Sequence, residues 1–312
     1  MARYALIIGI REYQSFNPLP KTTTDAEAVA QLLEKHGNFQ EVKRLPARWN
    51  QYQNCYEIAA RGVTGRELGE TLNTFLLKQA TKGDALIYFT GHGITVSDNL
   101  GQQSGYLATS DCWLEWDNQR IVGQFKGISL DSFNNIIRAS NLSSLVVLLD
   151  CCHSGHFLEQ NLIKQTLTAF NSQQDYYLIS ASRGFEEAYV GEEHSIFSGA
   201  LLQGLSPENA GSDGQISGDR LFDHIQRKLR QSGQEPIRLG WGSSITLVSY
   251  PQVELQKSDI TFNQDNPYLG LHAFESEQEQ YFCGREQGIR ALLERLTNNR
   301  FLTIIGPSGC GK

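Results

Sequence analysis

Apolar residues along this chain gather in short, uninterrupted runs. Runs without polar alternation are typical of strands that are buried on both faces of a sheet. The sequence therefore predicts buried strands, and a further short run is expected to form a closing strand. The four main runs lie at 4–10, 85–93, 143–155 and 175–182, and the closing one at 244–249.

Between these runs, apolar residues recur at spacings of three and four, which predicts amphipathic helices. At the first of them, a Thr or Asp is expected to cap the start, Asp25 and Glu27 suit the first turn, and Gly37 is expected to end the helix. Strands alternating with helices indicate an α/β fold with a largely parallel sheet, whose reactive groups belong at the carboxyl ends of the strands. The expected helices span 23–37, 65–80, 130–140, 196–205 and 217–232.

The character of the sequence changes after Tyr250. Residues 251–266 are polar, begin at Pro251 and are followed directly by Pro267, which is typical of a linker. Beyond them we expect a loop, an amphipathic helix and, at 300–312, a strand that enters a glycine-rich loop. The sequence thus divides into a domain at 1–250, a linker at 251–266 and a separate segment at 267–312.

Composition narrows the class of protein. Hydrophobic residues make up 40% of the 312 residues and charged residues 20%, as in an ordinary globular protein. A net charge of −7 disfavours nucleic acid as a partner and favours basic substrates. No apolar run is long enough for a signal peptide or a membrane span, so we expect a cytoplasmic protein without a membrane partner. The six cysteines lack the paired spacing of zinc sites and are expected to be free thiols.

Candidate chemistry lies at the ends of two buried strands. Cys151 and Cys152 follow Asp150 at the end of one strand, and His92 stands between two glycines at the end of another. A cysteine nucleophile needs a nearby base, and alternation along a strand would direct only one of the two thiols toward the loops. Packed cysteines beside a structural histidine explain these residues equally well, so the pattern alone leaves both interpretations open.

Two motifs carry a family resemblance. "YFTGHG" and, sixty residues later, "LLDCCHSG" resemble the two catalytic blocks of caspase-like cysteine peptidases, of the metacaspase and bacterial orthocaspase type. The likeness extends through "ALIIGIREY", "LPKTTTDAEAVAQLL", "YLISASRGFEEAY" and "IFSGALLQGL" and covers roughly residues 1–250. It implies a three-layer α/β/α sandwich, with a large-subunit-like part at 1–160 and a small-subunit-like part at 175–250.

The resemblance implies a role for individual residues. His92 takes the place of the family's catalytic histidine, Cys152 that of the nucleophile, and Cys151 a packing position. The backbone N–H groups of Gly93 and Cys152 would form the oxyanion hole. The P1 residue is the one before the scissile bond, and its side chain would bind in the S1 pocket. This pocket would contain two acids, and two threonines where metacaspases commonly have Cys and Ser. Its members would be Thr22, Asp25, Thr90 and Asp150.

An acidic S1 pocket implies cleavage after Arg or Lys. Animal caspases use arginines to bind a P1 aspartate, whereas a carboxylate in the pocket repels an aspartate and attracts a cation. The partners expected are therefore peptides and proteins with a basic P1 residue. Asp25 has a structural alternative, because an acid in the first turn of a helix stabilises the helix dipole.

The same resemblance suggests how the peptidase is activated. Caspase-like enzymes are often cut between their two parts, and Lys164 is the one basic residue in 156–175, so autocleavage after Lys164 is a hypothesis. The chemistry itself requires no cofactor. Calcium activates many metacaspases, but Asp98, Asp111, Asp117 and Asp213 show no EF-hand spacing, so no metal site is assigned.

The segment 267–312 resembles the entry of a STAND-type NTPase. "GPSGCGK" at 306–312 fits a phosphate-binding P-loop after the strand "FLTII", with Gly306, Gly309, Gly311 and Lys312 as its members. ATP and Mg²⁺ would then bind only in a longer protein, whose NTPase module could also mediate self-association. The alternative function is a non-proteolytic caspase-fold signalling or scaffold module that such an NTPase regulates.

Overall fold

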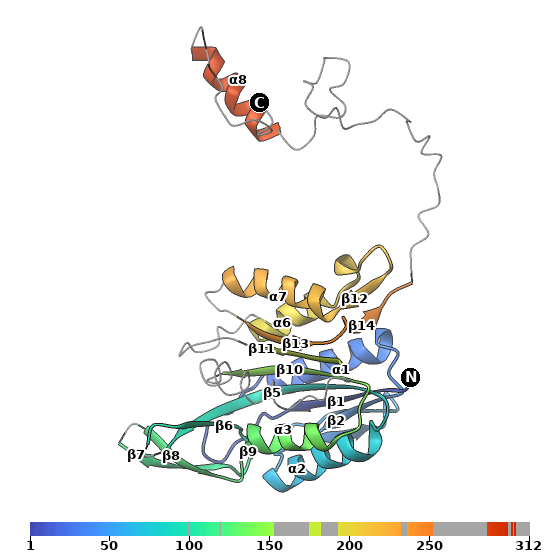
Figure 1. The fold of residues 1–312 in the computed structure, drawn as a ribbon, viewed down its shortest axis with the longest axis vertical. Helices are drawn as coiled ribbons and strands as arrows, with labels where there is room; N and C mark the ends of the chain where they lie inside the picture. Colours follow the sequence, from blue (N-terminus) through green and yellow to red (C-terminus); the bar gives the residue numbers. More distant parts are fainter. Residues whose placement is uncertain are drawn as a thin grey trace. The chain divides into compact units, whose positions relative to one another are not determined.

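A largely parallel sheet forms the centre of residues 1–252 (Figure 1). The computed structural model describes residues 1–98, 100–118, 120–152, 175–181, 193–231, 236–251, 286–298, 301 and 303. Strands run in the order β13-β11-β10-β5-β1-β2; the pairs among β11, β10, β5, β1 and β2 are parallel and β13 is antiparallel. The expected mostly parallel sheet is confirmed.

The main sheet and its extension contain eight described strands. They are β1 (Arg3–Gly9), β2 (Glu41–Leu45), β5 (Asp84–Ser97), β6 (Gln103–Leu107), β9 (Ile128–Ser129), β10 (Ser144–Cys152), β11 (Asp175–Ser180) and β13 (Ile237–Trp241). Three two-stranded pairs accompany it: β3 (Ala47–Asn50) with β4 (Cys55–Ile58), β7 (Trp113–Asp117) with β8 (Arg120–Phe125), and β12 (Gln215–Ser217) with β14 (Thr246–Ser249).

Helices cover both faces of the sheet and make the sandwich (Figure 1). One face packs against α1 (Thr22–His36), α6 (Ile196–Gly204) and α7 (Gly218–Gln231). The other packs against α2 (Gly65–Thr74), the π-helical turn η1 (Phe75–Gln79) and α3 (Leu130–Ala139), while the short 3-10 turn η3 is Pro207–Asn209. Alternate residues of each central strand enter opposite cores, since Ile87 and Val147 belong to one cluster and Tyr88 and Leu148 to the other. The expected three-layer architecture is confirmed.

Several local expectations were wrong. The first helix is not capped by a Thr or Asp side chain: Lys21 occupies the N-cap without a side-chain hydrogen bond, and Asp25 is directed elsewhere. The helix expected over 65–80 is present, but from Phe75 to Gln79 it is a π-helical turn rather than an α-helix. Strand β2, the β3–β4 and β7–β8 hairpins and the antiparallel edge strand β13 were not predicted, because these segments are short and contain few or no buried residues.

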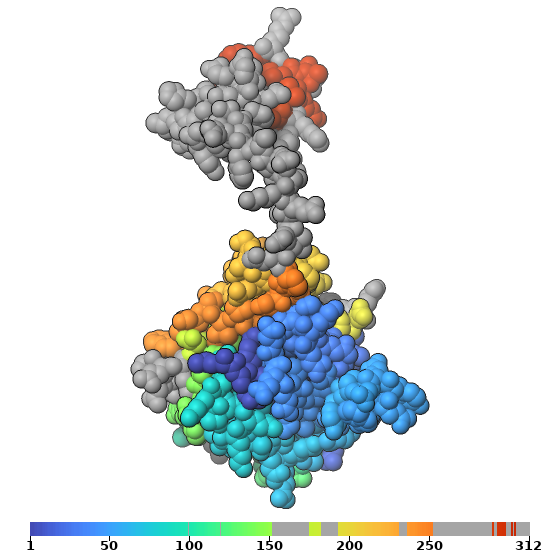
Figure 2. Space-filling view, turned by 90° about the vertical axis from the view of Figure 1, so that its right-hand side faces the viewer, coloured from blue at the N-terminus to red at the C-terminus, as the bar shows by residue number. Residues whose placement is uncertain are grey.

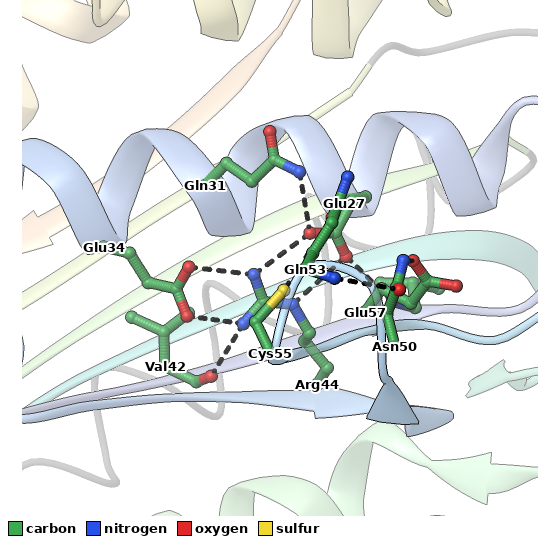
Figure 3. A network of polar contacts seen from close by, with 10 residues as sticks. Glu27, Gln31, Glu34, Val42, Arg44, Asn50, Gln53, Cys55 and Glu57 are labelled. Carbon is green, nitrogen blue, oxygen red and sulfur yellow. Dashed lines mark hydrogen bonds and ion pairs between the residues drawn. The ribbon is translucent and has the colours of Figure 1, made fainter. Parts of the chain in front are cut away.

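A buried arginine ties α1 to the β2 edge (Figure 3). The Arg44 side chain is only 3% exposed and forms ion pairs with Glu27 at 3.0 Å and Glu34 at 2.6 Å, both on α1. Glu27 also accepts a hydrogen bond from the backbone N–H of Ile58, 2.8 Å away on β4. The β3–β4 hairpin is thereby held to the helix, and Figure 2 shows the mid-blue segment around it projecting from the domain.

Strand β5 continues past the parallel sheet and pairs with β6. Its extension carries Ile94 and Val96, which form a small third cluster with Ala108 and Cys112. Tyr13 and Phe16, from the loop after β1, pack against this cluster. That loop therefore lies beside the carboxyl end of the central strands.

The second unit, Val253–Lys312, is described only through α8 (Glu286–Asn298) and two further residues. This helix confirms the amphipathic helix expected there, and Leu293 on it is 61% exposed. None of the described helices is long and apolar enough to cross a membrane.

Candidate active site

The two motif blocks end on neighbouring parallel strands. The register between β5 and β10 pairs Thr90 with Asp150, Gly91 with Cys151, and His92 with Cys152. Neighbouring strands lie about 4.8 Å apart, so these pairs are direct neighbours. The fold thus brings the candidate base next to the candidate nucleophile, at the carboxyl edge of the sheet.

A backbone carbonyl fixes the protonation pattern of His92. Its Nε2 atom lies 2.8 Å from the Asn17 carbonyl oxygen, in the loop after β1. A carbonyl only accepts hydrogen bonds, so Nε2 must carry a proton, and in the neutral imidazole Nδ1 then holds the lone pair. This is the tautomer of a ring that can take up a proton through Nδ1.

Aromatic side chains hold the His92 ring from the same loop. Tyr13 lies edge-on to the imidazole with ring centroids 4.7 Å apart, and Phe16 lies at 5.3 Å. The Tyr13 hydroxyl accepts the His92 backbone N–H at 2.9 Å and donates to the Ile10 carbonyl at 3.1 Å. Gly91 makes this approach feasible, because a Cβ there would lie only 2.6 Å from the Tyr13 hydroxyl.

Hydroxyl groups converge on one oxygen of Asp150. Ser195 and Ser198, at the start of α6, donate to Oδ2 over 2.7 and 2.6 Å, and Thr90 lies at 3.5 Å from the same atom. Because Ser198 gives its proton to the carboxylate, the buried Tyr88 phenol, 2.6 Å away, must be the donor to Ser198. The result is a directed chain from Tyr88 through Ser198 to Asp150.

Asp25 lies in the first turn of α1 and has no exposed surface. His194 Nδ1 lies 2.7 Å from its Oδ1, and the Ser195 backbone N–H donates to its Oδ2 at 3.1 Å. Gly9 lets α1 approach closely, since a Cβ there would lie 2.7 Å from both Ala26 Cβ and the Thr22 carbonyl oxygen. Ser195 therefore contacts both acids, Asp25 with its backbone and Asp150 with its hydroxyl.

The electrostatics of Asp150 follow from this environment. Burial raises the pKa of the Asp150 carboxyl to about 6; hydrogen bonds from Ser198 and Ser195 oppose the rise, and the charge of Asp25 adds to it. Asp150 nevertheless keeps part of its surface exposed, unlike Asp25. A cation that reached Asp150 would lower its pKa and favour its charged form.

The other predicted site residues lie partly in the core and partly outside the described residues. Cys151 is 1% exposed in the hydrophobic core, as a packing residue should be. Thr22 is buried, but its hydroxyl donates to the Leu19 carbonyl at 2.9 Å rather than to either acid. Gly93 is the next residue of β5 after His92, and only the backbone of Cys152 is described. Lys164, Gly306, Gly309, Gly311 and Lys312 lie outside the described residues.

The residues of this site that were not predicted include Tyr13, Asn17, His194, Ser195 and Ser198. The Ser-x-x-Ser spacing ahead of an apolar helix signals an N-cap, and Ser195 does accept the Ser198 backbone N–H at 3.1 Å. That spacing does not indicate that the two serine hydroxyls donate to the Asp150 carboxylate. Asn17 contributes a carbonyl, which every residue type has, so no sequence signal could reveal it.

Within the described part of the chain, no three His, Cys, Asp or Glu side chains are arranged to hold an ion. Two of the loop acids named above as possible calcium ligands have protein partners. Asp111 accepts the Gly65 N–H at 2.9 Å and pairs with Lys126, and Asp98 accepts the backbone N–H groups of Leu100 and Gln102 in its own turn. These contacts give both acids local structural roles.

Comparisons with known proteins agree with this architecture. Residues 2–257 match the family model described as Caspase domain, and residues 267–312 match Novel STAND NTPase 1. Protein GSU0716 from Geobacter sulfurreducens is similar in structure, with a TM-score of 0.53 and 14% identity over 81% of this chain and 98% of that one. Caspase-1 from Spodoptera frugiperda gives a TM-score of 0.49 and 12% identity over 80% and 92%. No curated protein matches the chain.

The family model spans most of the chain and includes both strand ends that form the site. The similarity to protein GSU0716 supports the fold alone. The chain therefore belongs to the caspase-domain family, and residues 267–312, after the caspase domain, match a STAND NTPase model.

Proposed function

We propose that the caspase domain is a cysteine endopeptidase of the metacaspase and orthocaspase type that hydrolyses peptide bonds after Arg or Lys. The observation that carries the proposal is the β5–β10 register, which pairs His92 with Cys152 and Thr90 with Asp150. One strand pair thus supplies a base, a nucleophile and, two residues earlier, an acid to recognise a cation.

In the proposed mechanism, His92 removes the Cys152 thiol proton through Nδ1, while its Nε2–H stays on the Asn17 carbonyl. The thiolate attacks the scissile carbonyl carbon and forms a C–S bond. His92 then gives its proton to the departing amine as the C–N bond breaks, leaving a thioester. Water, deprotonated by His92, attacks the thioester and releases the carboxylic acid and the thiol.

Backbone N–H groups would stabilise the oxyanion. Ala108 N–H donates to the His92 carbonyl at 2.9 Å, so residue 92 occupies a hydrogen-bonded position of the β5–β6 ladder. Because such positions alternate in an antiparallel pair, the N–H of Gly93 is directed away from β6. This direction supports the assignment of Gly93, together with the Cys152 N–H, to the oxyanion hole.

Charge supports the proposed preference for a basic P1 residue. Asp25 and Asp150 lie close enough for one to raise the pKa of the other, so the pocket that they would form is strongly negative. A P1 aspartate would add a third negative charge in a partly buried site, which costs several kcal/mol. A P1 Arg or Lys would instead offset one of these two negative charges.

The test is turnover of matched fluorogenic peptides that differ only at P1, carrying Arg, Lys or Asp, with and without calcium. We expect the Arg and Lys peptides to be cleaved, and Cys152→Ala to abolish cleavage of both. Cleavage of the Asp peptide alone would refute the proposed S1 pocket. Absence of any turnover would favour the alternative, a non-proteolytic signalling or scaffold module.

We also propose that the peptidase is the effector part of a cytoplasmic STAND NTPase protein. The match of residues 267–312 to Novel STAND NTPase 1 supports this assignment. Gly306, Gly309, Gly311 and Lys312 would bind the phosphates of ATP with Mg²⁺ in the longer protein, and the module would mediate self-association. The test is ATP binding by a chain extended through the complete NTPase module, compared with Lys312→Ala; equal binding by both would contradict the P-loop assignment.

A further inference from the structure

The two acids of the proposed S1 pocket are not equivalent. Both Asp25 oxygens are engaged, by His194 and by the Ser195 N–H, and no part of Asp25 is exposed. Asp150 is partly exposed, and its contacts with the hydroxyls of Thr90, Ser195 and Ser198 all fall on Oδ2. No described group donates to its Oδ1. A ligand can therefore reach Asp150 directly. To reach Asp25, it would first have to displace His194.

Ser195 is the residue that joins the two acids. Its backbone N–H binds Asp25 on α1, its hydroxyl donates to Asp150 at the end of β10, and the same oxygen accepts the Ser198 N–H as the cap of α6. Three elements that are distant in sequence thus meet at one side chain. The position of Ser195 is fixed by Asp25, and the orientation of Asp150 is fixed by Ser195.

We propose that Ser195 is a specificity-positioning residue, that the P1 cation binds Asp150 alone through Oδ1, and that Asp25 acts through the His194–Ser195 turn. The inference rests on the proposed peptidase function and adds a division of roles to it. Asp25 anchors the turn that carries Ser195, while Asp150 makes the direct contact with the P1 cation.

The hydroxyl and charged groups around Asp150 set its pKa, so a change in that pKa can test the proposal. Tyr88 and Thr90 face it from β5, Asp25 from α1, and Ser195 and Ser198 from α6. His194 is the basic group beside Asp25. The serine hydrogen bonds lower the pKa of Asp150 and the charge of Asp25 raises it, so removing one or the other has opposite effects.

The first experiment compares Ser195→Ala with Ser129→Ala in the intact chain. Ser129 is a matched control, because it caps α3 by accepting the Ser132 N–H at 3.0 Å and touches neither acid. Both variants lose a helix cap. Only Ser195→Ala should lower kcat/KM for a P1-Arg peptide, about tenfold and mainly through KM, since one hydrogen bond to a charged group is lost. Ser195→Thr, which keeps the hydroxyl, should restore most of the loss.

The second readout is the acid limb of the kcat/KM profile for the P1-Arg peptide. We expect Ser195→Ala to move this limb to higher pH and Asp25→Asn to move it to lower pH. Alkylation of Cys152 by iodoacetamide supplies the reference, because its pH dependence reports the Cys152–His92 pair without an occupied S1 pocket. A merely structural loss would lower activity without these opposite shifts.

A double-mutant cycle distinguishes a direct role of Asp25 from an indirect one. If Asp25 acts through Ser195, the Asp25→Asn, Ser195→Ala double variant should lose no more kcat/KM than the worse single variant. Multiplicative losses, or equal effects of Ser195→Ala and Ser129→Ala with an unshifted acid limb, would overturn the inference. Failure of the wild type to cleave any basic peptide would instead refute the proposed function, so the two failures are distinguishable.

Discussion

Gly91 shows how one absent side chain positions the proposed base. The Tyr13 hydroxyl accepts the His92 backbone N–H and lies only 2.6 Å from the position that a Cβ on residue 91 would take. We expect Gly91→Ala to displace Tyr13 and tilt the imidazole, and to lower kcat by at least about tenfold, because small misplacements of reacting groups are costly. Steady-state kinetics with a P1-Arg peptide provides the measurement.

Gly69→Ala is the control for this change. A Cβ at Gly69 would meet Ile128 at an ordinary 3.6 Å, and Gly69 lies inside helix α2, where Ala is the better residue. We expect Gly69→Ala to leave kcat unchanged. Equal kcat for the Gly91→Ala enzyme and the wild type would contradict the role of the Tyr13 contact.

Asp150→Asn should separate activity from stability. Because the folded pKa of about 6 lies above the ordinary 3.8, the folded state binds more protons in that window, and stability falls as pH rises from about 4 to about 6. Asn removes the buried charge but can still accept both serine hydrogen bonds. Urea denaturation at pH 7 should show a gain of roughly 1–3 kcal/mol, and the slope of stability against pH in this window should shrink.

The same Asp150→Asn variant should lose the acceptor for a basic P1 residue. We expect its kcat/KM for P1-Arg peptides to fall at least about a hundredfold, as expected when one partner of a desolvated charge pair is lost. Unchanged kcat/KM would show that Asp150 does not bind the P1 side chain. Lower stability at pH 7 would show that its hydrogen bonds outweigh the cost of burying its charge.

At the scale of elements, Arg44 ties α1 to β2 through two glutamates (Figure 3). Replacing it with Met leaves Glu27 and Glu34 without their guanidinium partner, and we expect a loss of about 3 kcal/mol in the free energy of unfolding. Arg48→Met is the control, since Arg48 is 69% exposed and pairs with Glu57 at the surface, where such a pair contributes about 1 kcal/mol or less. Similar losses in urea denaturation would contradict this account of α1.

The elements that the sequence predicted well are those with long apolar patterns. The apolar runs 85–93 and 145–149 form buried parts of β5 and β10, as expected, and the register of these strands brings His92, Asp150 and Cys152 to one edge of the sheet. The hairpins and β13 were missed because pairing partners, rather than a periodic pattern, define them. Ser195 was missed for a related reason: its cap is local, whereas its two acidic partners are brought to it only by the fold.

At the scale of the whole molecule, strand pairing joins the two subunit-like parts. β10 and β11 lie on either side of the hypothesised cleavage site at Lys164 and pair in parallel from Ser144 to Leu149. We expect autocleavage to give two fragments on a denaturing gel that still co-elute in native size-exclusion chromatography. Both fragments should be absent from Cys152→Ala and from Lys164→Gln. Their appearance in Cys152→Ala would show that another protease cuts the chain, and separation under native conditions would contradict the structural account.

The central claim is that Cys152, activated by His92, attacks the carbonyl that follows a basic side chain. Mapping a peptidyl acyloxymethyl ketone with P1 Arg onto the intact chain by mass spectrometry tests this claim most directly. The account predicts one label, on Cys152, formed much more slowly in His92→Ala and with the matched P1-Asp reagent. A label on Cys55, Cys112 or Cys151 instead, or equal labelling by the P1-Asp reagent, would contradict it.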